Sequence, residues 1–234
     1  MLFRNMKRWI GAAVLIFSAI PPNLAAAQPA IVVGFVGGFV RHDDLVHQEV
    51  QLAARLRDAY PSDVTVEIFA NSAGHRAHRE ILRLLDTDRN GTLSAAEKSG
   101  ARVVLYGHSW GASETVTTAR RLQRDGIPVM LTIQVDSVSK LGANDRIIPA
   151  NVAQAVNFYQ ADGLLRGQRE ILAADPSRTR ILGNFQLHYK VHSSNCDDYP
   201  WYARLLMRPH IEIESDPVIW DRIESLVRAH LSSE

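Results

Sequence analysis

The chain has 234 residues, of which 46% are hydrophobic and 22% charged, and its 26 basic residues nearly balance 25 acidic ones. This length and composition fit one globular domain and exclude a disordered, collagen-like or coiled-coil chain. The single cysteine, Cys196, excludes an internal disulfide and any cysteine-based zinc or iron–sulfur site. A net charge of +1 gives no indication of a nucleic-acid partner, which would need a clustered basic surface.

The first 27 residues have the three-part pattern of a secretory signal peptide. Basic residues occur among the first eight positions, residues 9–20 are apolar, and alanines precede Gln28. The apolar run is too short to cross about 30 Å of hydrocarbon. We therefore predict cleavage before Gln28, a secreted or periplasmic protein without a transmembrane anchor, and a single domain over residues 28–234.

Strand and helix patterns alternate along that domain. Strands are predicted over residues 31–35, 64–69, 102–106, 127–135 and 179–189, and the first is a short apolar, β-branched run typical of a fully buried strand. Apolar residues at helical spacing predict helices over residues 45–60, 75–85, 112–122, 152–159 and 216–230. The first of these helices is expected to start at a cap supplied by Asp43 or Asp44. This alternation predicts an α/β fold, a mostly parallel sheet with helices on both faces.

The strongest motif is the sequence Gly107-His108-Ser109-Trp110-Gly111, which has the form G-x-S-x-G. A predicted buried strand runs into it and a predicted helix runs out of it. In that context the serine sits on a tight, strained turn with its hydroxyl projecting above the strand ends. Glycines two residues to either side let the neighbouring backbone pass closely. Ser109 is therefore the candidate nucleophile.

With this motif the chain resembles the α/β-hydrolase superfamily, specifically its lipase and esterase members, over most of residues 31–231. The resemblance implies a triad in the order serine, acid, histidine, so both partners are expected after Ser109. Asp136 lies at the end of an apolar strand, where parallel α/β sheets place their chemistry. Asp145 lies in a loop that resembles the acid loop of other family members. We favour Asp136 because of its place at the strand end and keep Asp145 as the alternative.

A serine hydroxyl is a poor nucleophile until a base takes its proton, which makes a histidine necessary. His210 lies in an expected loop just before the last helix, which is where the resemblance places the catalytic histidine. His192, in a polar loop, is the alternative. His188 and His230 lie within a predicted strand and a predicted helix, where structural or solvated roles are expected.

The resemblance also implies an oxyanion hole made of two backbone N–H groups. One belongs to the residue after the nucleophile, Trp110. The other comes from a loop after an early strand, where this chain has Gly37-Gly38-Phe39 in place of the common His-Gly pair. Phe39 is the expected second donor and Gly38 the next choice.

Residues 86–97 match the twelve-residue calcium loop of an EF-hand. Oxygen-bearing side chains stand at positions 1, 3, 5, 9 and 12, and Gly91 stands at position 6, where the loop turns sharply. The alternative is a polar surface loop that carries the pattern by chance. We predict a structural Ca²⁺ ion held by six residues, Thr92 through its carbonyl: Asp86, Asp88, Asn90, Thr92, Ser94 and Glu97.

These features predict a secreted serine hydrolase that cleaves a carboxylic ester through an acyl-enzyme and needs no cofactor for catalysis. The expected partner is a small-molecule or lipid ester. The same triad would also serve a thioesterase or an acyltransferase, and the same scaffold could belong to a calcium-binding protein without turnover. The sequence leaves the acyl chain length and the oligomeric state open.

Overall fold

The computed structural model describes residue 28, residues 30–189 and residues 195–232. The predicted signal peptide and the alternative histidine, His192, lie outside these residues. None of the helices in the described part of the chain combines the length and the apolar character that a membrane span requires.

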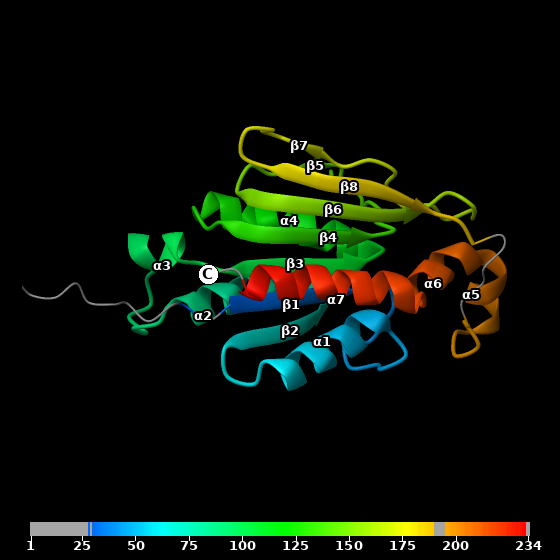
Figure 1. The fold of residues 1–234 in the computed structure, drawn as a ribbon, viewed down its shortest axis with the longest axis horizontal. Coiled ribbons are helices and arrows are strands. Elements are labelled where there is room, and N and C mark those ends of the chain that lie inside the picture. The colour runs from blue at the N-terminus through cyan, green and yellow to red at the C-terminus, as the bar shows by residue number, and fades with distance from the viewer. Residues whose placement is uncertain (1–27, 29, 190–194, 233–234) are drawn as a thin grey trace, which may run out of the picture.

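A six-stranded sheet forms the centre of the molecule (Figure 1). Every pair of neighbouring strands runs parallel, so all six carboxyl ends lie at one edge. In spatial order the strands are β2 (Val64–Ala70), β1 (Ala30–Val36), β3 (Val103–His108), β4 (Val129–Val135), β6 (Val152–Gln160) and β8 (Arg180–Leu187). A separate two-stranded sheet pairs β5 (Ile147–Ile148) with β7 (Leu172–Ala173).

Helices cover both faces of the sheet, as predicted, because its strands are apolar on both sides. In β1, Ile31 packs in one hydrophobic cluster and its neighbour Val32 in the other, since successive side chains of a strand point to opposite faces. One face carries α1 (Gln48–Ala59) and α7 (Pro217–Ser232), and the other carries α2 (Gly74–Leu85) and α4 (Trp110–Arg124). The shorter helices are η1 (Asn71–Ala73), α3 (Ala95–Ser99), α5 (Trp201–Leu206) and α6 (Arg208–Glu214).

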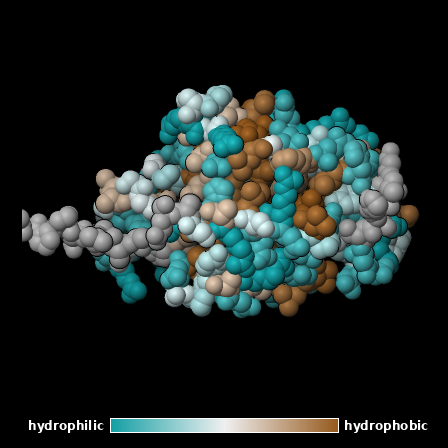
Figure 2. All heavy atoms as spheres, viewed as in Figure 1, coloured by the Kyte–Doolittle hydropathy of each residue, from teal (hydrophilic) through white to brown (hydrophobic). Residues whose placement is uncertain are grey.

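The face that carries α7 is only partly covered over β4, β6 and β8. Figure 2 shows hydrophobic residues gathered at the surface there, beside α7. Met130, Leu182 and Phe185 are partly buried hydrophobic residues of this region. The guanidinium of Arg222 on α7 lies 3.9 Å from the centre of the Phe185 ring, within the range of a cation–π interaction. The long side chain of Arg222 thus shields part of the apolar strip from water.

The prediction of a helix over residues 152–159 was wrong, because this segment is the strand β6. Its alanines and glutamines favour a helix locally. The segment nevertheless pairs with β4 on one side and β8 on the other, and it buries Val156 and Phe158. Burial and pairing on both sides outweigh a local propensity of a few tenths of a kcal/mol per residue.

The start of the first helix also differs from the prediction. Neither Asp43 nor Asp44 caps it, because α1 begins at Gln48 with His47 in the cap position. Asp44 instead accepts a hydrogen bond from the N–H of Val46 within the preceding turn. The last helix, predicted over residues 216–230, begins at Pro217, and a proline suits a first helical position because the N–H that it lacks would be unpaired there.

Candidate active site

Ser109 lies on the turn between β3 and α4, at the edge of the sheet where the strands end. Its φ and ψ angles are 57° and −124°, a conformation that is unfavourable for a residue with a side chain. The Ser109 N–H donates to the carbonyl oxygen of Val135 over 2.9 Å, which fixes the turn against the end of β4. The serine side chain lines the wall of a cavity.

Two glycines allow this turn to pack against β1. A Cβ atom at Gly111 would lie 2.1 Å from the carbonyl oxygen of Phe35, and one at Gly107 would lie 2.6 Å from the carbonyl carbon of Gly111. Backbone atoms cannot move away as a flexible side chain can, so any larger residue would displace the turn. The G-x-S-x-G spacing is therefore required by the close approach of these backbones.

His210 faces Ser109 from α6. Its Nε2 lies 2.9 Å from the Ser109 Oγ, and the residue is 4% exposed. The sequence predicts a loop at this position, and that prediction was wrong, because His210 lies within α6. A proline usually interrupts a helix. Pro209 stands in the first turn of α6, where a backbone N–H would have no partner within the helix, so its absence there costs nothing.

Asp136 directly follows β4 and completes a hydrogen-bonded chain of three side chains. Its Oδ2 lies 2.6 Å from Nδ1 of His210, and the carboxylate is fully buried. Oδ1 accepts from the N–H groups of Gln160 at 3.1 Å and Gly167 at 2.9 Å, and Oδ2 accepts from the Gln160 amide at 2.8 Å. These donors offset the desolvation of the carboxylate and hold it toward His210.

Gly167 is needed for this arrangement, because a Cβ atom there would lie 2.2 Å from Oδ1 of Asp136. We expect Gly167→Ala to push the carboxylate away from His210 and to lower kcat for an ester by at least about 10-fold, since displacements of about 1 Å at a catalytic group have effects of this size. Gly126→Ala is the control. The φ of Gly126 is +74°, and no neighbouring atom lies within 4 Å of a Cβ atom placed there. Alanine at this position therefore introduces backbone strain without any contact with Asp136. Kinetics and thermal unfolding of both variants test this, and equal kcat values would contradict it.

Asp145, the alternative acid, is buried away from His210. Its carboxylate accepts hydrogen bonds from the hydroxyls of Ser137 and Ser139, and its carbonyl oxygen accepts from the Gln134 amide at 3.0 Å. These bonds tie together the loop that follows β4. Of the two candidate acids, the structure places only Asp136 beside a described histidine.

The loop that follows β1 lies against the Ser109 turn. A Cβ atom at Gly37 would lie 3.6 Å from Cβ of Ser109, and one at Gly38 would lie 2.7 Å from the Trp110 ring. The rings of Phe39 and Trp110 are 5.4 Å apart. Trp110 is also the first residue of α4, where the helix carries partial positive charge. Both residues line the cavity beside Ser109, and their role as oxyanion donors stays a prediction.

Backbone strain is concentrated at this site. Among the described residues, the non-glycine residues with positive φ are Phe39 (61°), Arg89 (57°), Ser109 (57°) and Asp136 (42°). Three of these four residues belong to the site, and the fourth lies in the predicted calcium loop. Such conformations cost about 1–3 kcal/mol each and persist where the surrounding structure holds them in place, which is typical of functional sites.

A cavity of about 710 Å³ opens beside Ser109 and His210. This volume falls within the range of about 300–1,000 Å³ that is common for small-molecule sites. The rest of the wall is mainly apolar and includes Val46, Leu165, Tyr199, Tyr202, Met207 and Ile211. Exposed apolar side chains of the neighbouring helix α5 include Trp201, Leu205 and Leu206. The wall suits an uncharged ligand with an apolar portion.

The predicted calcium loop has its acidic side chains gathered at one point. Carboxylate oxygens of Asp86, Asp88 and Glu97 lie within 4.8 Å of one another. Glu97 accepts hydrogen bonds from the N–H and hydroxyl groups of Ser94 and of Thr87, and these bonds lower its pKa to about 2. Each oxygen of a carboxylate has more than one acceptor site, so these bonds leave Glu97 able to contact a cation.

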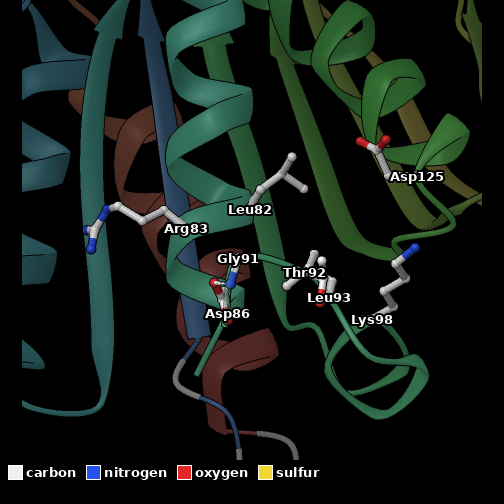
Figure 3. Close-up of a pocket in the computed structure, with 8 residues that line it drawn as sticks. All are labelled: Leu82, Arg83, Asp86, Gly91, Thr92, Leu93, Lys98 and Asp125. Atoms are coloured by element: carbon white, nitrogen blue, oxygen red, sulfur yellow. Dashed lines mark hydrogen bonds between the residues drawn. The ribbon is translucent and has the colours of Figure 1, made fainter. Parts of the chain in front are cut away.

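The other predicted ligands of the loop lie nearby. Asn90 accepts the N–H and hydroxyl of Thr92, and Ser94 caps α3. Gly91 has the positive φ, 83°, that the sharp turn requires. Figure 3 shows Asp86 and Gly91 close together and Lys98 extending toward Asp125. These residues line an open hollow of about 400 Å³. Calcium binding itself stays a prediction.

The parallel sheet covered on both faces, with a serine on a strand–turn–helix at the carboxyl ends of its strands, defines an α/β-hydrolase fold. The structure is similar to that of a cutinase-like protein from Cryptococcus sp. (12% identity, 90% of this chain and 98% of that chain, TM-score 0.47). It is also similar to a thermostable esterase from Pseudomonas putida (11% identity, 92% and 78%, TM-score 0.49). No protein-family model and no curated protein matches the sequence. Identities this low do not carry an activity from those proteins to this chain.

Proposed function

We propose that this protein is a serine hydrolase of carboxylic esters. The observation that carries the proposal is the chain Ser109–His210–Asp136, with contacts of 2.9 Å and 2.6 Å at the wall of an apolar cavity. This order of contacts is the one that activates a serine hydroxyl, because the imidazole accepts its proton and the carboxylate stabilises the imidazolium that forms.

In the proposed reaction, the Ser109 Oγ attacks the ester carbonyl while His210 takes the hydroxyl proton. The oxygen of the tetrahedral intermediate receives hydrogen bonds from the backbone N–H groups of Trp110 and Phe39. Collapse of the intermediate breaks the ester bond, and His210 returns the proton to the leaving alcohol. Water, deprotonated by His210, then attacks the acyl-enzyme and releases the acid and the free serine.

The cavity wall supports an ester with an apolar acyl or alkyl part, because it is mainly apolar. Apart from the histidines, its acidic and basic side chains are those of Arg41, Asp44, Asp198 and Glu214. The experiment is hydrolysis of p-nitrophenyl esters of graded acyl length, with thioesters of the same acyl groups in parallel. A higher kcat/KM for oxygen esters supports the proposal. A clear preference for thioesters would favour a thioesterase instead, and no turnover of either class would contradict a hydrolase.

We further propose that the protein acts outside the cytoplasm after removal of residues 1–27. The basic, apolar and small-residue segments of its N-terminal sequence support this proposal. Extracellular calcium is often plentiful enough to fill sites with dissociation constants of about 10⁻⁴–10⁻³ M. Export and a weak calcium loop are therefore compatible with each other.

We propose that the loop over residues 86–97 binds Ca²⁺ and contributes to stability rather than to the reaction. Addition of about 10 mM Ca²⁺ is expected to raise Tm by about 3–8 °C, because binding to the folded state alone stabilises it by mass action. Asp88→Asn keeps an oxygen to accept the Asn90 N–H but removes a charge, so it should abolish most of the increase. Mg²⁺ at equal ionic strength is the control. A Tm that does not respond to Ca²⁺, or responds equally in Asp88→Asn, would contradict the proposal.

A further inference from the structure

A second group of titratable side chains lies buried beside the candidate active site, and the proposed reaction does not use it. The group consists of His47 and Glu49 at the start of α1, His108 at the end of β3, and Glu214 at the end of α6. His47 is 8% exposed and the other three are at most 3% exposed. Elements far apart in the sequence therefore bring two imidazoles and two carboxyl groups together out of contact with bulk water.

The ring nitrogens of both histidines face the carboxyl groups. Nδ1 of His47 lies 2.5 Å from Oε1 of Glu214. Nδ1 of His108 lies 3.3 Å from Oε2 of Glu214 and 3.9 Å from Oε1 of Glu49. One ligand atom from each of His47, Glu49 and Glu214 lies within 4.8 Å of the others. Ligand atoms of His47, Glu49 and Glu214 thus converge, and Nδ1 of His108 lies beside the two carboxyl groups.

Several of these atoms make no hydrogen bond of ordinary distance and angle with the described residues. They are both carboxylate oxygens of Glu49 and Nδ1 of His108. An unpaired buried carboxyl group is costly, and a cation among these atoms would remove the cost.

The remaining ring nitrogen of His108 points away from the group. Its Nε2 lies 3.2 Å from the carbonyl oxygen of His210, which can only accept a hydrogen bond. The hydrogen of a neutral imidazole is therefore on Nε2, and Nδ1 presents a lone pair to the carboxyl groups. A metal-binding histidine usually donates its other N–H to a carbonyl or carboxylate in this way.

We propose that His47, Glu49, His108 and Glu214 bind one Zn²⁺ ion. Imidazole nitrogens and carboxylate oxygens are ligands that Zn²⁺ accepts in tetrahedral sites. Ligand atoms of such a site are about 3.4 Å apart at metal–ligand bond lengths of about 2.1 Å, and the two distances from His108 are close to this value. The shorter contact between His47 and Glu214 has to lengthen as the ion enters.

An ion at this position would join the elements that carry the candidate catalytic residues. His108 directly precedes Ser109 in the chain, and Glu214 lies one helical turn after His210. His47, His108 and Glu214 also line the cavity, which gives an ion a route from the solvent. The exclusion of cysteine-based zinc sites leaves a histidine and glutamate site of this kind open.

The experiment uses the full purified protein, stripped of metal with a chelator and titrated with Zn²⁺ against a chromophoric competitor. We expect about one Zn²⁺ bound per chain with higher affinity than any surface site. When free Zn²⁺ exceeds the dissociation constant about a hundredfold, Tm should rise by about 5–10 °C. Co²⁺ bound in place of Zn²⁺ should show the visible absorption of a tetrahedral ion.

Two variants and one control decide the assignment. Glu49→Gln has nearly the shape of the protonated glutamate and should fold, yet it should lose at least about 10-fold in Zn²⁺ affinity. His47→Gln is the second variant, in case the first perturbs folding. Asp88→Asn, in the predicted calcium loop, should bind Zn²⁺ like the wild type. No tight Zn²⁺ site in the wild type, or equal affinity in Glu49→Gln and the wild type, would overturn the proposal. These readouts are independent of ester hydrolysis.

Discussion

Replacement of Ser109 by alanine is expected to lower kcat for a chromogenic ester by about 10⁴-fold or more, because no covalent intermediate can form without the hydroxyl. The loss of structure should be small. The only side-chain hydrogen bond recorded for the Ser109 hydroxyl within the described residues is the contact with His210, and alanine has the same Cβ at this strained turn.

Ser113→Ala is the matched control for this experiment. Ser113 lies one turn further along α4, is buried and outside the cavity wall, and its hydroxyl accepts from the N–H of Lys140 at 3.4 Å. It should keep kcat near that of the wild type. Kinetics and thermal unfolding of both variants provide the measurement. Substantial turnover by correctly folded Ser109→Ala protein would refute the assignment of the nucleophile.

Asp136→Asn is expected to lower kcat by about 10³–10⁴-fold. The main-chain N–H groups of Gln160 and Gly167 both donate to Oδ1 of Asp136, so the amide oxygen of an asparagine will take that position. Its NH₂ group will then face Nδ1 of His210 in place of Oδ2. A donor at that point favours the imidazole tautomer with its hydrogen on Nε2, which cannot accept the proton of Ser109.

Asp145→Asn separates a catalytic role from a structural role of the two acids. Ser137 and Ser139 donate to different oxygens of Asp145, so an asparagine can accept from one hydroxyl through its amide oxygen and donate its NH₂ to the other, which then has to turn and act as acceptor. We therefore expect kcat near that of the wild type and a modest loss of stability. Steady-state kinetics of the two variants side by side give the answer. The reverse order, with Asp145→Asn inactive and Asp136→Asn active, would contradict the assignment of the acid.

Features that depend on local sequence could be predicted well. The buried strands, the parallel sheet and the turn at Ser109 follow from apolar runs and from glycine spacing, and the structure contains all of them. The place of Asp136 at the end of β4 was likewise a local signal, because the end of an apolar run marks the end of a strand. The strand β6 was missed because its pairing, not its composition, determines its conformation.

Features that depend on contacts between distant segments could not be predicted. Nothing in the sequence marks Gln160 and Gly167 as the residues that hold Asp136, since Gln160 ends the strand beside β4 and Gly167 lies in the loop that follows that strand. The same holds for Glu49 and Glu214, which lie on different helices and meet only in the folded protein. The sequence motif identified Ser109, but the surroundings of His108 in the same motif had no local signal.

The central claim is that Ser109 is a nucleophile activated by His210, and covalent labelling tests it most directly. The protein should be incubated with a fluorophosphonate, digested, and analysed by mass spectrometry for the site and stoichiometry of the adduct. The account predicts one adduct per chain, on Ser109, with ester hydrolysis lost in proportion to labelling, and much slower labelling of Asp136→Asn. A folded protein whose Ser109 stays unmodified, or one that is labelled elsewhere while its activity declines, would contradict it.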